Sequence, residues 1–214
     1  MADNYLEKRY EEVFGSGAAK GGRSSARRAG LDTLLKNNRS YREYDTSYEV
    51  MQAQLEAMVR VNTMLASGRN AQSLRFKILT ERTGSDRLKG LYKLGRALPE
   101  LHLPREGAEP RAFIVICSTA APCKNVFIDL GISCQAMLLK ATEMGLQGVI
   151  ICNFNPSEVR AALDLPSDPL AIVAVGKGLE KIELVPVSAG DDLNYYRRDG
   201  VHYVPKLRME DLLI

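Results

Sequence analysis

Three short polar segments, far apart in the sequence, carry residue types that suit an anionic ligand and that a hydrophobic core does not need. Their candidate ligand-binding residues are Arg39, Ser40 and Arg42, then Asn70 and Gln72, then Lys206 and Arg208. Arginine offers a planar fork of donors, lysine a point charge and serine a hydroxyl, so such a set suits a phosphate close to a dianion. Each segment taken alone is equally typical of the solvated end of a helix or strand.

Composition and charge limit the class of protein to which this chain can belong. The chain has 214 residues, of which 45% are hydrophobic, and this is enough for one substantial core. The 29 Lys and Arg against 26 Asp and Glu leave a formal charge of +3, too small for a dedicated nucleic-acid binder. No apolar run approaches the roughly 20 residues that span a bilayer, and the first residues lack the apolar core of a signal peptide. We therefore expect a cytoplasmic protein that binds neither nucleic acid nor membrane.

The chain divides into a short N-terminal part and one larger domain. We predict a helix over residues 1–14 and a flexible connector over 15–30, which is rich in Gly, Ser and Ala. This connector lacks the order of a phosphate-binding loop, whereas its Arg23, Arg27 and Arg28 leave a nucleic-acid-binding arm open as a less favoured alternative. Residues 31–214 form the second predicted unit.

Hydrophobic periodicity predicts helices that alternate with strands in residues 31–214. We expect helices from Leu31, from a capping box at Thr46–Glu49 to about Gly68, over 85–98, over 125–144, after the cap residue Asn155, and over 209–214. We expect strands over 74–80, 113–117, 149–152, 170–175 and 201–204. The helix over 125–144 is apolar nearly all round, so it is buried centrally or against a partner subunit. The alternation indicates an α/β layered sandwich.

The remaining chemical side chains favour plain structural roles. Cys117, Cys123, Cys134 and Cys152 form no close pair and have only two histidines to join them, so we predict reduced cysteines that act as small core residues rather than a zinc site. The Gly176-Lys177-Gly178 sequence follows a strand but lacks the third glycine of a dinucleotide fingerprint, and we interpret it as a loop.

Four motifs, taken in order, resemble the nitroreductase family of FMN-dependent oxidoreductases. They are Asn38-Arg39-Ser40-Tyr41-Arg42, Ser67-Gly68-Arg69-Asn70-Ala71-Gln72, Asp129-Leu130-Gly131 and Lys206-Leu207-Arg208. The chain departs from the family pattern where Asn38 replaces an arginine, Ala66 a proline, and Ser73-Leu74 a Pro-Trp pair. The resemblance extends from about Leu34 to the last residues of the chain.

This resemblance implies a fold and a dimer. The fold is an α+β or α/β three-layer αβα sandwich, with a central mixed sheet flanked by helices and a C-terminal extension that packs on the partner subunit. A homodimer would hold FMN at its interface.

The resemblance also implies roles for individual residues. Arg39, Ser40, Lys206 and Arg208 would bind the phosphate, and Arg42 would lie near the pyrimidine end of the isoalloxazine. Ser67, Asn70 and Gln72 would come from the second subunit, and the backbone at Cys152 and Asn153 would face flavin N5. Asp129, at the start of a helix, is interpreted as structural.

The implied activity is electron transfer from NADH or NADPH through FMN to a nitroaromatic or quinone by a ping-pong mechanism. Hydride transfer between stacked rings is a positioning task and requires no catalytic triad. Because one cation of the motif is lost at Asn38, a flavin-binding protein without turnover, such as a carrier or sensor, is the alternative hypothesis.

Overall fold

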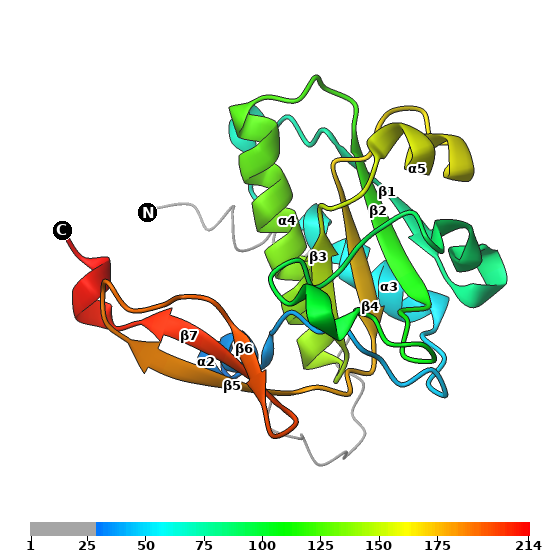
Figure 1. Ribbon diagram of the computed structural model, residues 1–214. Helices are drawn as coiled ribbons and strands as arrows, with labels where there is room; N and C mark the ends of the chain where they lie inside the picture. Colours follow the sequence, from blue (N-terminus) through cyan, green and yellow to red (C-terminus); the bar gives the residue numbers. More distant parts are fainter. Residues whose placement is uncertain (1–28) are drawn as a thin grey trace, which may run out of the picture.

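The core of the protein is a four-stranded sheet in the order β1-β2-β4-β3, and helix α4 (Lys124–Glu143) runs beside it (Figure 1). The computed structural model describes residues 29–214, so the helix and connector predicted for the first 28 residues lie outside the described part. The core strands are β1 (Leu74–Leu79), β2 (Ala112–Ser118), β4 (Ala171–Gly176) and β3 (Gln147–Ile151). Every neighbouring pair in this sheet is antiparallel, and only an isolated bridge between Ser40 and Gly148 is parallel.

Alternation along the strands gives this sheet two apolar faces. Ile114 and Ile116 of β2 belong to the cluster formed with α3 (Gln52–Arg60) and α4 (Lys124–Glu143). Phe113 and Val115 point to the other face and pack with α5 (Pro156–Leu163). Successive side chains of a strand point to opposite faces, so a strand that is buried on both faces is apolar throughout, as predicted for this segment.

The long helix α4 extends beside the core sheet (Figure 1). Met137, which is completely buried, lies on its inner face, whereas Phe127, Ile128 and Ile132 remain largely exposed. The predicted helix over 125–144 is thus confirmed, whereas its burial against a partner subunit stays a prediction. In the described part of the chain, no helix has the length and apolar character needed to cross a membrane.

A second sheet of three strands follows the core and projects away from it (Figure 1). Its order is β5-β7-β6, with β5 (Lys181–Val187) parallel to β7 (Val201–Leu207) and β6 (Tyr196–Arg198) antiparallel to β7. Only β7 was predicted, as a shorter strand over 201–204. The short helix α2 (Leu31–Asn37) confirms the helix expected at Leu31.

Three predicted helices differ from the structure: the one that begins at Thr46, the one over 85–98 and the terminal one over 209–214. The capping box at Thr46 is wrong, because the Thr46 hydroxyl donates to the carbonyl of Gly107, and α3 begins only at Gln52. The segment 85–98 forms a 3₁₀ turn over Ser85–Leu88 and then irregular chain. Gly90 and Gly95 take positive φ there, which interrupts the helical path.

The remaining elements are short 3₁₀ turns, and they complete the described chain. These are η1 (Val61–Thr63), η2 (Gly68–Asn70), η3 (Glu81–Thr83), η4 (Ser85–Leu88), η5 (Pro99–Leu101) and η6 (Met209–Leu212). The last of these replaces the terminal helix predicted over 209–214.

Candidate cofactor site

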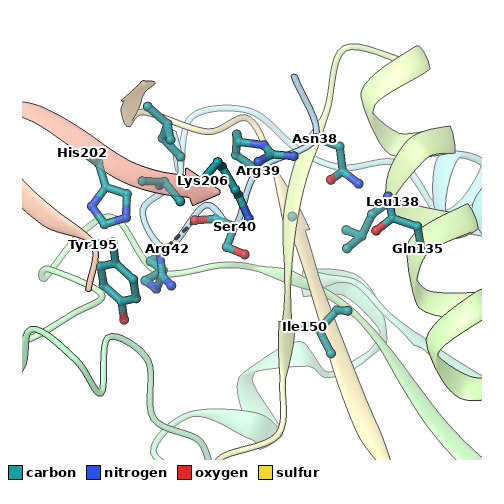
Figure 2. Close-up of a pocket in the computed structure, with 13 residues that line it drawn as sticks. Asn38, Arg39, Ser40, Arg42, Gln135, Leu138, Ile150, Tyr195, His202 and Lys206 are labelled. Atoms are coloured by element: carbon teal, nitrogen blue, oxygen red, sulfur yellow. Dashed lines mark hydrogen bonds between the residues drawn. The ribbon is translucent and has the colours of Figure 1, made fainter. Parts of the chain in front are cut away.

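A cavity of about 360 Å³ lies where the segment after α2, strand β3, helix α4 and the second sheet meet (Figure 2). Its volume falls in the range of small-molecule sites. The side chains around it come from distant parts of the sequence: Asn38, Arg39, Ser40, Arg42, Gln135, Leu138, Gly148, Ile150, Ile182, Tyr195, His202, Val204 and Lys206. Four residues predicted from the sequence, Arg39, Ser40, Arg42 and Lys206, thus line one cavity.

Backbone pairing at the edge of the core sheet fixes the first segment in this cavity. Ser40 forms a parallel bridge with Gly148, and the Tyr41 amide donates to the Gly148 carbonyl at 3.1 Å. A Cβ atom at Gly148 would lie 2.5 Å from the carbonyl oxygen of Ala174. Only glycine therefore allows β3 to approach β4 closely and still receive the 39–42 segment.

Arg39 is held partly below the surface with unused hydrogen-bonding capacity. One guanidinium nitrogen donates to the Leu35 carbonyl at 2.7 Å, while Nε is buried without a hydrogen-bond partner among the described residues. Burial lowers the pKa of Arg39 from its ordinary value. An unsatisfied buried donor is unfavourable, and an anionic ligand would offset this cost.

A cation and two rings form the other wall of the cavity. The Arg42 guanidinium lies 4.8 Å from the centre of the Tyr195 ring and donates to the Ser40 carbonyl at 3.0 Å. The Tyr195 and His202 rings are tilted against each other, with centroids 5.0 Å apart. Burial, with smaller effects from Arg42 and Arg197, lowers the pKa of His202 to about 4. His202 is therefore neutral at physiological pH.

Arg208 does not line this cavity. Its guanidinium donates to the Ser188 hydroxyl at 3.2 Å, and its amide donates to the carbonyl of Val187, the last residue of β5. Of the two cations in the third polar segment, Lys206 therefore lines the cavity and Arg208 lies outside it.

Gln72 of the second polar segment lines a different cavity of about 350 Å³, together with Ser67 and Asp129, whereas Asn70 lines neither cavity. Arg69, Asn70 and Gln72 have positive φ values of 55°, 53° and 46°, a conformation that is uncommon outside glycine. The Asp129 carboxylate accepts a hydrogen bond from the Gly68 amide at 2.9 Å. Asp129 therefore holds this strained turn, in line with the structural role expected for it.

Cys152 and Asn153 follow β3 at the surface and line neither of these two cavities. The Asn153 carbonyl accepts a hydrogen bond from the Lys93 amide at 2.9 Å. Cys123 is also exposed, whereas Cys117 and Cys134 are buried. The prediction that cysteines act as core residues is therefore correct for only two of the four.

Among the cavity residues with polar or ionisable side chains, three were not predicted as site residues from the sequence: Gln135, Tyr195 and His202. Gln135 stands in the long apolar helix, where an isolated polar residue is a usable signal. Tyr195 immediately precedes β6, a strand that was not predicted. His202 lies on β7, where a strand was predicted, but no motif marked its side chain as part of a site.

Comparison with known proteins identifies the class of protein. The sequence model of the nitroreductase family matches residues 35–177, about two thirds of the chain, and the protein belongs to this family. A search of curated proteins gave no match.

Solved structures share this fold. A nitroreductase family protein from Clostridium difficile 630 is similar with 25% identity and a TM-score of 0.55, over 71% of this chain and 86% of that one. A protein from Exiguobacterium sibiricum described as a nitroreductase in complex with FMN gives 16% identity and a TM-score of 0.58, over 71% and 90% of the two chains. A mutant of an FMN- and NADPH-dependent nitroreductase from Sphingopyxis sp. strain HMH gives 16% and 0.57, over 71% and 89%.

Proposed function

We propose that this member of the nitroreductase family is an FMN-dependent oxidoreductase that passes electrons from NADH or NADPH to a small organic acceptor, such as a nitroaromatic or quinone. One observation carries the proposal: Arg39, Ser40 and Lys206, from opposite ends of the domain, line a single cavity. The family membership and the FMN named for similar structures support the choice of cofactor.

The donor set fits the phosphate of FMN. Arg39 has a buried Nε without a partner in the described chain, Ser40 supplies a hydroxyl, and Lys206 supplies a charge on an exposed side chain. Hydrogen bonds in which a partner is charged are the strong ones, so these three groups together suit a dianion. Arg208 stays in the proposal as a residue of the phosphate site that would act only if its side chain left Ser188.

The residues of this chain would bind and orient the cofactor. When bound here, FMN would supply the redox chemistry of a ping-pong reaction between a nicotinamide and the acceptor. Arg42 would place a positive charge beside the pyrimidine end of the isoalloxazine. The backbone at Cys152 and Asn153 would orient the ring. No described side chain is needed to move a proton at a carbon centre.

A homodimer completes the proposed site. The exposed Phe127, Ile128 and Ile132 of α4 give an apolar face of the kind that protein–protein interfaces cover. Ser67, Asn70 and Gln72 would reach the cofactor of the partner subunit across this face, and the second sheet would pack on the partner as a C-terminal extension. With helices on both faces of the core sheet, each subunit would be a three-layer sandwich, and the dimer would reside in the cytoplasm.

Flavin binding without turnover is the second candidate function, and Asn38 is the observation that favours it. Asn38 lines the cavity at the place where the family motif has an arginine, so one cation is missing there. Rapid bleaching of bound flavin by NADH or NADPH, followed by reoxidation with a quinone, would decide for the enzyme. Flavin that stays oxidised under both nicotinamides would decide for the carrier or sensor.

Absorption spectra test the site directly. The Lys206→Gln variant should weaken FMN binding about 5- to 30-fold, the range for one charged hydrogen bond reduced for an exposed side chain. Lys181→Gln is the matched control, because Lys181 lies on β5 of the same sheet, pairs with Glu183 and does not line the cavity. Wild-type protein that takes up no FMN, or equal FMN affinity in both variants, would refute the proposed site.

A further inference from the structure

Two buried carboxylates, Glu43 and Glu180, lie directly behind the cavity wall, with 1% and 3% of their side chains exposed. The Arg197 guanidinium, which is 19% exposed, joins them: it contacts Glu43 at 2.9 Å and also forms an ion pair with Glu180. Arg105 adds a second ion pair to Glu43 from the protein surface. Two negative and two positive charges thus balance.

This network touches the cofactor cavity through the backbone of Arg42. A Glu180 carboxylate oxygen accepts hydrogen bonds from the Arg42 amide and from the Glu43 amide. The Glu43 carbonyl accepts from the Leu179 amide at 3.0 Å. The conformation that brings Arg42 to the cavity therefore depends on Glu180.

Arg197 also links this network to the second sheet. It belongs to β6 and is paired in register with His202 of β7, a cavity residue. Lys206 stands further along β7, and Tyr195 immediately precedes β6. The second sheet projects from the core in Figure 1. The ion pair of Arg197 with Glu43 holds the cavity end of this sheet to the 39–45 segment, and its ion pair with Glu180 holds the residue before β5, which itself accepts from the Arg42 amide.

We propose that Arg197 is a positioning residue for the cofactor cavity: without touching the ligand, it neutralises Glu43 and Glu180 and holds the β6–β7 wall against Arg42. The proposal rests on FMN as the occupant of the cavity. Loss of Arg197 would leave one uncompensated negative charge beside a site for an anion. A buried carboxylate without its cation repels a nearby anion strongly, because little solvent screens its charge.

The test compares FMN affinity and flavin midpoint potential in the full-length protein. In Arg197→Met, the dissociation constant for FMN should rise about tenfold or more, and the potential should become more negative, because the unpaired charge opposes reduction. Arg198→Met is the matched control, since Arg198 is the next residue of β6 and its side chain is 69% exposed. If Arg197→Met and Arg198→Met have equal affinities, or if Arg197→Met keeps the wild-type potential, the proposal is overturned.

Two further variants keep the test decisive if Arg197→Met does not fold. Lysine retains the charge but cannot span two carboxylates with a planar fork, so Arg197→Lys should bind FMN several-fold more weakly than wild type. In Glu180→Gln/Arg197→Met, Glu43 keeps its partner Arg105 and no net charge remains, so the flavin potential should return toward the wild-type value. Wild-type affinity in Arg197→Lys would overturn the proposal, and so would a double variant whose flavin potential stays well below the wild-type value.

Hydrogen exchange separates this proposal from the proposed function. If wild-type protein takes up no FMN, the proposed function fails, and amide exchange in β7 then tests the positioning role without any ligand. Faster amide exchange over Val201–Leu207 in Arg197→Lys than in Arg198→Met would support the proposal that Arg197 holds the second sheet in place. Equal exchange would overturn it.

Discussion

Replacing Gly148 with alanine should damage the fold and the cofactor site together. The added Cβ would lie 2.5 Å from the carbonyl oxygen of Ala174 and 2.7 Å from a methyl group of Leu138. A carbon normally keeps roughly 3.3 Å from such an oxygen. Ala174 is completely buried in β4, between β2 and β3, so its carbonyl cannot retreat without disturbing two ladders. We expect a loss of about 2–3 kcal/mol in the free energy of unfolding, the usual cost of overpacking a dense core.

The measurement is thermal unfolding followed by circular dichroism. A loss of this size should lower Tm by about 4–12 °C in a protein of this length. FMN affinity should fall as well, because the Gly148 carbonyl holds the Tyr41 amide beside Arg39 and Ser40. Gly30→Ala is the control, since its new Cβ would meet no atom within 4 Å and its φ is −66°. A Gly148→Ala protein that melts within 1–2 °C of the Gly30→Ala protein, about the scatter of surface substitutions, would refute this reasoning.

Three further changes test other parts of the molecule. Asn155→Ala removes the side-chain acceptor for the Ser157 amide at the start of α5 and should cost about 1 kcal/mol, measured by urea unfolding. Burial lowers the pKa of His202 from 6.5 to about 4, so the unfolded chain binds a proton more readily than the folded protein. The free energy of unfolding should therefore fall as the pH drops from 6.5 toward 4. The His202→Gln variant should show a flatter pH dependence. Phe127→Glu places a charge on the exposed face of α4 and should shift the protein to a monomer in size-exclusion chromatography, with loss of FMN; a dimer that persists would contradict the proposed interface.

Elements with strong local signals were predicted well. The apolar run in β2 and the long helix α4, which ends before Gly145, needed only hydrophobicity and a stop residue. The segment 85–98 has a helical pattern of apolar residues, but Gly90 and Gly95 take conformations that a helix cannot include. Strand β5 alternates between exposed and half-buried residues and contains a proline, so its sequence could not be distinguished from that of a loop.

The cofactor site was predictable only where the family resemblance supplied positions. Arg39, Ser40 and Lys206 came from motifs, and their convergence could not be read from spacing, because it depends on how the second sheet meets β3. Arg197 and Glu180 carried no motif at all. Their pairing joins segments that only tertiary structure brings together, and charged residues in a sequence are normally expected at the surface.

The central position of β7 in the second sheet makes the cavity a late product of protein synthesis. Ser40 leaves the ribosome long before Lys206, and β5 and β6 both lack their pairing partner until β7 has emerged. A chain interrupted between Lys177 and Gly200 would contain all four strands of the core sheet and the segment with Arg39 and Ser40, yet lose the wall that carries Lys206 and His202. Such a fragment would lack one wall of the candidate cavity, so under the proposed function flavin colour during expression would report chains that extend through β7.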